Sequence, residues 1–367
     1  MSSPREANVS LKNRALEALG AEIDDPTVSS AFSEDGQYLL LADSLDDGKG
    51  VELFVEFSAA LSEPPESLDS ELALFAKNRA LFEGALTTRL SVDGEPLRPT
   101  APAEILCQDF DSDRSFVETS VPLTGGRRFS RRFLLARNES LLLILDEFSG
   151  SEADRENSPA MENRAFFPLS SEVEVLEDEE ARELALRRRR IEEKAAKKTR
   201  VAKKKLDDLS EEERLFAELY SEEPTEAETF ENLAGIFPLA LPEWKADKSR
   251  GELVAKKRPF GLELTSRRNG GSLVSALLID LNARRVARPR SWRPLTVGEN
   301  MEVAPEDSAV GYKIQLGREQ YLLYASTSPR PAIRSVLGRN LLSDFMFGKF
   351  TAKRGVEPIV DVEIDQE

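Results

Sequence analysis

Alternating hydrophobic and polar positions run through much of this chain and predict β-strands. The pattern is clearest from Thr87, where TTRLSVDGEPLRP carries Asp93-Gly94 between two extended halves. Asp-Gly is a strong hairpin signal because the turn needs positive φ angles. Further on, RRFSRRFLLARNESLLLILDEF predicts two long strands joined near Asn138, the second almost wholly apolar. NRAFFPL, at 163–169, predicts another strand.

The same pattern occurs on both sides of this region. Earlier segments are QYLLLADS from Gln37 and VELFVEF at 51–57, while the run from Leu72 to Phe82 fits helix or strand. Later segments are GIFPLALPEW, GELVAKKRPFGLELTSR, GSLVSALLIDL, MEVAPEDSAVGYKIQLG and EQYLLYAST. Strands so closely spaced predict a mainly β fold, a large antiparallel β-sandwich with a charged α-helical insertion.

Four segments are expected along the chain. A polar N-terminal segment, 1–36, contains a short helix from Leu11 to Leu19 that ends at Gly20. The first part of the sandwich occupies 37–171 and the second part 225–367. Between them, 172–224 is rich in Glu, Ala, Leu, Lys and Arg with no Gly or Pro as far as Tyr220, which predicts helix. Ser210 with Glu213 forms a capping box for its second helix.

A basic segment lies inside the predicted insertion. Residues 187–205 hold 11 basic and 2 acidic residues, a local charge of +9. One hypothesis is that this helix binds nucleic acid or an acidic protein. A second is a coiled-coil arm, and a third, which we favour, is a solvated helix held by local ion pairs. The candidate anion- or partner-binding residues are Arg187, Arg188, Arg189, Arg190, Lys197, Lys198, Lys203, Lys204 and Lys205.

Composition excludes several kinds of chemistry. The chain has no histidine and one cysteine, Cys107, so no His-containing triad or imidazole base exists. No phosphate-binding glycine loop is present, and no cofactor is expected. The net charge of −17 disfavours nucleic acid except at the basic helix. Without a signal-peptide core, an apolar span or a disulfide, we expect a cytoplasmic protein with no membrane contact.

A second basic cluster, RRVARPRSWRPL at 284–295, contains a tryptophan. Arg288, Arg290 and Arg293 around Trp292 could hold an acidic glycan or another anion by bidentate contacts and stacking. In the alternative, Trp292 packs in the core and the arginines stay solvated. We favour that alternative.

Two further patterns have a structural alternative. DFDSD at 109–113 starts like a calcium loop but lacks the glycine and glutamate that complete one, so a polar turn is expected and no metal site. Tyr312, Tyr321 and Tyr324 fall in one pair of predicted strands. They could serve a lyase as acid or base, but alternation along half-buried strands explains them without catalysis.

Several strand segments resemble a known family. GGRRFSRRFLLARNESLLLILDEF resembles the stretch of heparinase II/III-like proteins in which a basic strand precedes an apolar one. WRPLTVGENMEV, AVGYKIQLGREQYLLYAST and VLGRNLLSDFMFGKF resemble segments of a related, uncharacterised bacterial family. The resemblance covers about 85–170 and 230–365 and implies the sandwich fold. Lyases of this type add a helical toroid and use Tyr and His; the N-terminal region is too short for a toroid, and no catalytic residue carries over.

Three functional hypotheses follow. The first is a non-catalytic cytoplasmic binding or scaffold protein, whose partner is an unknown protein or an acidic glycan. The alternative is a divergent polysaccharide lyase or hydrolase that acts on acidic glycans through Tyr and carboxylates. The third is nucleic-acid or acidic-protein binding through the basic helix.

Overall fold

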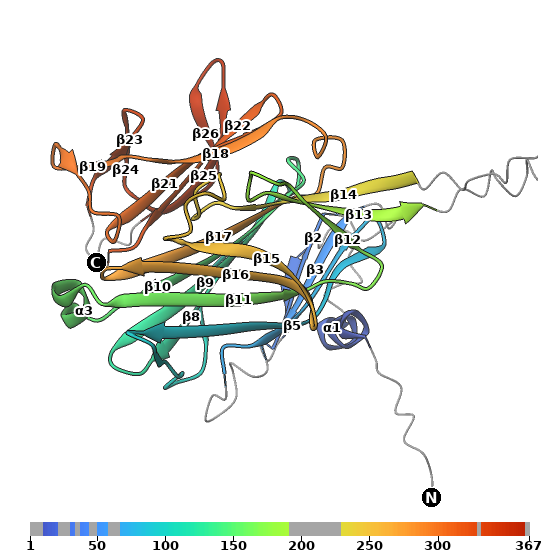
Figure 1. Cartoon of the computed structure of the whole chain (residues 1–367), viewed down its shortest axis with the longest axis horizontal. Helices are drawn as coiled ribbons and strands as arrows, with labels where there is room; N and C mark the ends of the chain where they lie inside the picture. Colours follow the sequence, from blue (N-terminus) through green and yellow to red (C-terminus); the bar gives the residue numbers. More distant parts are fainter. Residues whose placement is uncertain are drawn as a thin grey trace, which may run out of the picture.

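The described part of the chain consists mainly of antiparallel strands (Figure 1). The structure, a computed structural model, describes residues 10–20, 30–33, 37–43, 50–57, 67–190, 229–328 and 332–363. Two large sheets pack face to face, and a third sheet covers the far side of one of them. This confirms the mainly β, antiparallel prediction.

We call the nine-stranded sheet that contains most of the N-terminal strands the outer sheet. In spatial order its strands are β1 (Ser30–Phe32), β2 (Tyr38–Ala42), β3 (Val51–Glu56), β4 (Ser70–Ala76), β5 (Arg79–Val92), β11 (Ala160–Pro168), β16 (Phe260–Asn269) and β15 (Gly251–Lys257), and β6 (Glu95–Pro96) pairs with β5. The ambiguous run from Leu72 to Phe82 is strand, in β4 and β5. The predicted Asp93-Gly94 turn is confirmed, with φ of 51° and 84°.

The central sheet has eight strands. In spatial order they are β12 (Glu174–Glu177), β13 (Leu184–Arg190), β14 (Thr229–Pro238), β17 (Ser272–Asp280), β10 (Leu141–Ser149), β9 (Arg127–Ala136), β8 (Arg114–Leu123) and β7 (Glu104–Phe110). β9 and β10 are the two long strands predicted on either side of Asn138.

The third, C-terminal sheet has five strands: β18 (Arg290–Leu295), β21 (Ala309–Leu316), β22 (Glu319–Ser326), β25 (Ser343–Thr351) and β26 (Gly355–Glu363). A small four-stranded sheet lies beside it, made of β20 (Glu302–Val303), β19 (Val297–Glu299), β23 (Arg334–Val336) and β24 (Arg339–Leu341). In Figure 1 these orange to red strands form a separate layer from the blue and green ones.

The apolar run of β10 is explained by its position in the middle layer. Successive side chains of a strand point to opposite faces. Leu142 and Ile144 enter the core shared with the outer sheet. Leu141, Leu143 and Leu145 enter the core shared with the C-terminal sheet. Because both faces are covered, the strand is apolar at every position from Leu141 to Leu145.

The predicted N-terminal helix is confirmed as α1 (Leu11–Leu19). The Ser10 side chain accepts a hydrogen bond from the Asn13 amide at its start, and Gly20, with a φ of +46°, ends it. Its buried residues Leu11, Ala15 and Leu19 pack on the face of the outer sheet that points away from the central sheet. A second short helix, α3 (Glu152–Asn157), follows β10.

The helical prediction is wrong for the first part of the expected insertion. Residues 174–177 and 184–190 are the strands β12 and β13, which pair antiparallel to each other, and β13 also pairs antiparallel with β14. Leu184 and Leu186 lie on the same face of β13 and enter the main core. This burial overrides the helix propensity of the Glu-, Ala- and Arg-rich composition. Residues 191–228, which include the predicted capping box at Ser210 and most of the predicted basic segment and coiled-coil arm, lie outside the described residues.

Candidate functional site

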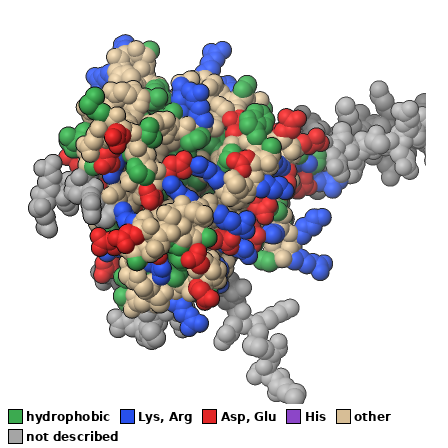
Figure 2. Space-filling view, turned by 60° about the vertical axis from the view of Figure 1, so that its left-hand side comes forward, with side chains coloured by type: hydrophobic (Ala, Val, Ile, Leu, Met, Phe, Trp, Pro, Cys, Tyr) green, Lys and Arg blue, Asp and Glu red, His purple; other side chains and the backbone are tan. Residues whose placement is uncertain are grey.

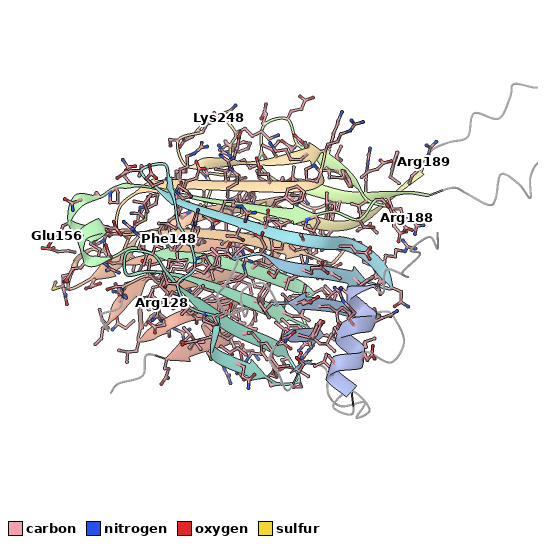
Figure 3. All side chains as sticks on the ribbon, turned by 90° about the horizontal axis from the view of Figure 1, so that it is seen from below. Arg128, Phe148, Glu156, Arg188, Arg189 and Lys248 are labelled. Carbon is pink, nitrogen blue, oxygen red and sulfur yellow. The ribbon has the colours of Figure 1, made fainter. Side chains whose placement is uncertain are left out.

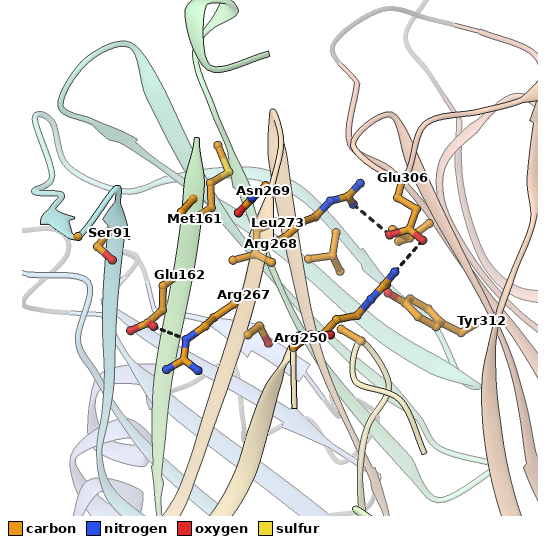
Figure 4. Close-up of a pocket in the computed structure, with 17 residues that line it drawn as sticks. Ser91, Met161, Glu162, Arg250, Arg267, Arg268, Asn269, Leu273, Glu306 and Tyr312 are labelled. Carbon is orange, nitrogen blue, oxygen red and sulfur yellow. Dashed lines mark hydrogen bonds and ion pairs between the residues drawn. The ribbon is translucent and has the colours of Figure 1, made fainter. Parts of the chain in front are cut away.

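A groove of about 760 Å³ lies where the outer, central and C-terminal sheets meet (Figure 4). Its walls come from β11, β16, β17 and β21, together with the turns before β15 and β21. The volume falls in the range of ligand-binding clefts. The charged and phenolic side chains that line it are Glu162, Arg250, Arg267, Arg268, Glu306 and Tyr312.

The end of β16 supplies two of the arginines. Arg267 lies directly opposite Glu162 in the β11–β16 ladder, so their side chains share a face. The next residue, Arg268, points the other way and reaches Glu306, in the turn before β21. Arg267 and Arg268 are consecutive on β16, but their side chains therefore line two different parts of the groove.

The third arginine is placed by a glycine. Gly251 begins β15 with a φ of +121°, and a Cβ there would lie 1.9 Å from the carbonyl oxygen of Thr265. Only glycine allows this close approach of β15 to β16. The carbonyl of the preceding Arg250 then accepts a hydrogen bond of 2.8 Å from the Arg267 amide. Arg250 and Arg267 are thus fixed side by side through the backbone.

Ion pairs hold the arginines around the groove. Arg267 Nε donates to Glu162 Oε2 at 2.6 Å. Arg250 Nη2 donates to Glu306 Oε1 at 3.0 Å, while Arg268 Nη1 lies 3.6 Å from Glu306 Oε2. The Glu306 carboxylate therefore bridges two arginines, one with each oxygen. Arg250 and Arg267 keep 47% and 45% of their side chains exposed, so both remain accessible from solvent.

The surroundings shift three pKa values. Burial opposes ionisation of Glu162, but the hydrogen bond and charge of Arg267, with the charge of nearby Arg164, outweigh it and lower its pKa. The hydrogen bond to Glu306 raises the pKa of Arg250. Burial and the Glu306 charge raise the pKa of Tyr312. At neutral pH the groove therefore presents guanidinium ions, carboxylates and a neutral phenol.

This arrangement suits an anion. The lining has three arginines and two glutamates, an excess of one positive charge, on a chain of net charge −17. Guanidinium groups present planar forks of donors that match carboxylate or sulfate geometry. Nowhere in the described ranges do three potential metal-ligating side chains gather into a site.

The predicted basic segment is only partly described. Arg187, Arg188, Arg189 and Arg190 lie on β13 and not on a helix. Arg187 sits over the Phe230 ring at 3.9 Å and 3.5 Å from Glu174, and Arg188 lies 3.5 Å from Glu172. Figure 3 shows Arg188 and Arg189 at the periphery of the sheets. The five candidate lysines fall outside the described residues: Lys197, Lys198, Lys203, Lys204 and Lys205. Binding by this segment stays a prediction.

The second predicted patch, around Trp292, is divided between core and surface. Trp292 is 2% exposed, packs edge-on against Phe237, and donates from Nε1 to the Leu241 carbonyl at 2.9 Å. Arg290 pairs with Glu183 at 2.7 Å. Arg288 and Arg293 are exposed. The indole therefore lies in the core rather than at a stacking surface.

The other expected residues have structural partners. Tyr321 is buried and donates to Glu139 Oε2 at 2.5 Å, and buried Tyr324 contacts Arg334. In DFDSD, Asp111 accepts the amides of Asp113 and Arg114 and shapes a polar turn, as expected.

Sequence reasoning missed the groove itself. Of its arginines, Arg267 is the last residue of the predicted strand segment GELVAKKRPFGLELTSR, Arg250 and Arg268 flank that segment, and Glu306 falls in MEVAPEDS. The available signal was the pair Arg267-Arg268 at a strand end, with Arg250-Gly251 before the preceding strand. Only the pairing of β15 with β16 brings these arginines together.

The face of the molecule shown in Figure 2 has no large patch of a single charge sign. Acidic and basic side chains are interspersed on the face shown. Among the described helices, none combines the length and hydropathy needed to cross a membrane.

Comparison with known proteins gives structural matches alone. No protein-family model and no curated protein sequence matches the chain. Heparan sulfate lyase HepC from Pedobacter heparinus matches with 11% identity over 83% of this chain and a TM-score of 0.48. Heparinase III, the BT4657 gene product, matches with 9% identity over 82% and a TM-score of 0.43. A chondroitin lyase, the baculovirus envelope protein ODV-E66, matches with 10% identity over 83% and a TM-score of 0.29.

This chain spans 44%, 43% and 46% of the lengths of those three proteins. The matches confirm the resemblance to heparinase II/III-like proteins that the strand segments indicated. Because the identities are low and the TM-scores are below 0.5, no residue role and no activity is transferred from them.

Proposed function

We propose that this chain is a non-catalytic binding module for an acidic glycan, which it holds by carboxylate groups in the arginine groove. The observation that supports this most directly is the convergence of Arg250, Arg267 and Arg268, from strand β16 and the turn before β15, around a cleft of about 760 Å³. Charge-assisted hydrogen bonds from guanidinium to carboxylate are among the strong contacts available to a protein.

The arginines have donors to spare. Within the described part of the chain, Arg267 uses only Nε toward Glu162, and Arg250 uses only Nη2 toward Glu306. A guanidinium carries five N–H donors. A ligand carboxylate can therefore bind the remaining nitrogens while the internal ion pairs keep the side chains in place.

Binding suits the groove better than Tyr-dependent elimination. Tyr312 is the tyrosine of the groove, and its raised pKa keeps the phenol protonated at neutral pH. A neutral phenol is a poor base for the proton that a lyase removes, and the Tyr312 side chain, at 6% exposure, gives a substrate little access. This favours the binding hypothesis over the alternative of a divergent lyase.

A glycan also suits the groove better than nucleic acid. A net charge of −17 repels a dense polyphosphate, and Tyr312, at 6% exposure, offers no free face for base stacking. Uronate polymers carry at most one carboxylate per sugar unit, so their separate carboxylates match separate arginines and need no stacking surface.

Calorimetry with polygalacturonate, alginate and hyaluronan, against neutral dextran, tests the proposal. We expect salt-sensitive binding of at least one polyuronate and none of dextran. Arg267→Gln or Arg250→Gln should weaken binding ten- to a hundredfold, the loss of one charged hydrogen bond of about 1.5–3 kcal/mol. Arg128→Gln, an exposed arginine outside the groove, is the matched control.

Two results would overturn the proposal. One is the absence of binding to any polyuronate. The other is binding that the groove variants leave unchanged. Release of unsaturated sugar products, followed by ultraviolet absorbance, would instead support the lyase alternative.

A further inference from the structure

An apolar cavity of about 220 Å³ adjoins the arginine groove. The two cavities share four lining residues, Arg250, Glu306, Val310 and Tyr312. The remaining lining of the smaller cavity comes mainly from β18, β19 and the start of β21. Its apolar members are Pro294, Leu295, Val297, Val303, Ala304 and Ala309.

The ion pair between Arg250 and Glu306 lies on the boundary between the two cavities. Figure 4 shows both side chains beside Tyr312, at the end of the groove toward the C-terminal sheet. On the groove side, Arg268 reaches the same Glu306 carboxylate. A ligand carboxylate at this boundary can therefore contact the arginines, while a group attached next to it contacts the apolar walls of the smaller cavity.

A uronate without a substituent would bind the arginines but would gain nothing from the apolar walls of the adjoining cavity. Its hydroxyl groups would lose water against the walls formed by Leu295, Val297 and Ala304 without gaining hydrogen bonds, which costs free energy. An acyl or alkyl group would gain instead, since each buried methyl group is worth about a fourfold gain in affinity. A volume of 220 Å³ has room for a short acyl chain.

We infer that the ligand of the groove is a uronate glycan with a small apolar substituent, such as an O-acetyl ester, next to its carboxylate. The carboxylate binds Arg250 and Arg268, and the acyl group enters the adjoining cavity. This inference rests on the proposed function and adds the chemical class of the ligand to it.

The test compares one polymer in two forms. Chemically O-acetylated alginate and the same sample after mild alkaline deacetylation are titrated into the intact chain by calorimetry. We expect the acetylated form to bind at least fourfold more tightly. Val303→Asn should reduce that ratio toward one, because Val303 lines the cavity yet is 72% exposed and can be replaced without disturbing the core.

Met301→Asn is the matched control. Met301 is fully exposed on the same turn, is not part of the lining of either cavity, and should leave the ratio unchanged. Equal binding of the two alginates, or a preference that Val303→Asn leaves intact, overturns this inference while the proposed function stands. Failure of both alginates and of the other polyuronates to bind overturns the proposed function and this inference with it.

Discussion

The guanidinium of Arg131 meets the carboxylate of Asp146 at two points in the interior between the outer and central sheets. Nε lies 2.6 Å from Oδ1 and Nη2 lies 2.8 Å from Oδ2. Neither side chain is more than 4% exposed. Thr88 on β5 accepts from Arg131, and Asn163 on β11 donates to Asp146. The pair therefore ties the central sheet to the outer sheet.

Replacing Asp146 with Asn should destabilise the fold strongly. The change leaves the Arg131 charge buried without a counter-charge, which costs about 3–5 kcal/mol of unfolding free energy. Urea denaturation measures the loss. Glu263→Gln removes a surface partner of Lys256, which is 41% exposed, and should cost less than about 1 kcal/mol. Equal losses of unfolding free energy in the two variants would show that burial of the ion pair does not determine the cost of breaking it.

Replacing Trp292 with Phe should lower stability and leave glycan binding intact. The variant leaves the buried Leu241 carbonyl without its indole donor and shrinks a core side chain, a cost of about 1–3 kcal/mol. Thermal melting and calorimetry on the same preparation separate the two effects. Loss of binding at unchanged stability would mean that the indole contacts ligand after all.

The carboxylate of Asp154 should make stability fall in acid. Burial opposes its ionisation, but hydrogen bonds from Arg127 and from Ser151 lower its pKa below the ordinary aspartate value. The folded state then binds the proton less tightly than the unfolded chain, whose aspartate pKa is about 3.9. The stabilisation is therefore complete well above pH 4 and is lost as the pH falls through the folded-state pKa.

Asp154→Asn is accordingly expected to lose roughly 2 kcal/mol at pH 7. The difference from the parent protein should shrink as the pH falls toward 2. Urea titrations across that pH range check this. A difference that stays constant with pH would contradict the role assigned to the Asp154 charge.

Replacing Gly251 with Ala should disturb both fold and groove. The new Cβ would lie 1.9 Å from the Thr265 carbonyl oxygen, so β15 must move away from β16 and take Arg250 with it. We expect a loss of more than about 2 kcal/mol together with weakened polyuronate binding. Melting and calorimetry report both.

Gly338→Ala is the control for backbone conformation alone. Gly338 also has a positive φ, of +76°, but no atom lies within 4 Å of its added Cβ. It should cost about 1 kcal/mol and leave binding unchanged. Similar losses of stability in both variants would mean that the positive φ, and not the contact with Thr265, is the reason that position 251 requires glycine.

Local patterns in the sequence predicted the local structure well. The predicted helix Leu11–Leu19 forms and ends at Gly20, and Asp93-Gly94 forms the expected turn, because each signal depends on residues close together in the chain. The double-sided burial of β10 is also visible in its unbroken apolar run. These features need no knowledge of the distant chain.

The predictions were wrong or incomplete for segments whose structure depends on strands distant in the sequence. Leu184 and Leu186 belong to a segment with the composition of a helix, yet pairing with β14 makes it strand. Likewise Glu306 and Arg268 meet only because the C-terminal sheet packs beside the end of β16. Nothing in the spacing of these residues along the chain encodes that contact.

The position of β17 has a consequence for how the chain is completed during synthesis. In the central sheet, β17 separates β10 from β14, and it pairs with both. Until residues 272–280 have left the ribosome, β7–β10 and β12–β14 remain two incomplete sheets with open edges. A nascent chain stalled before that point leaves the edges of β10 and β14 open to pairing with other chains and is prone to aggregation. One late strand thus determines when the central sheet becomes continuous.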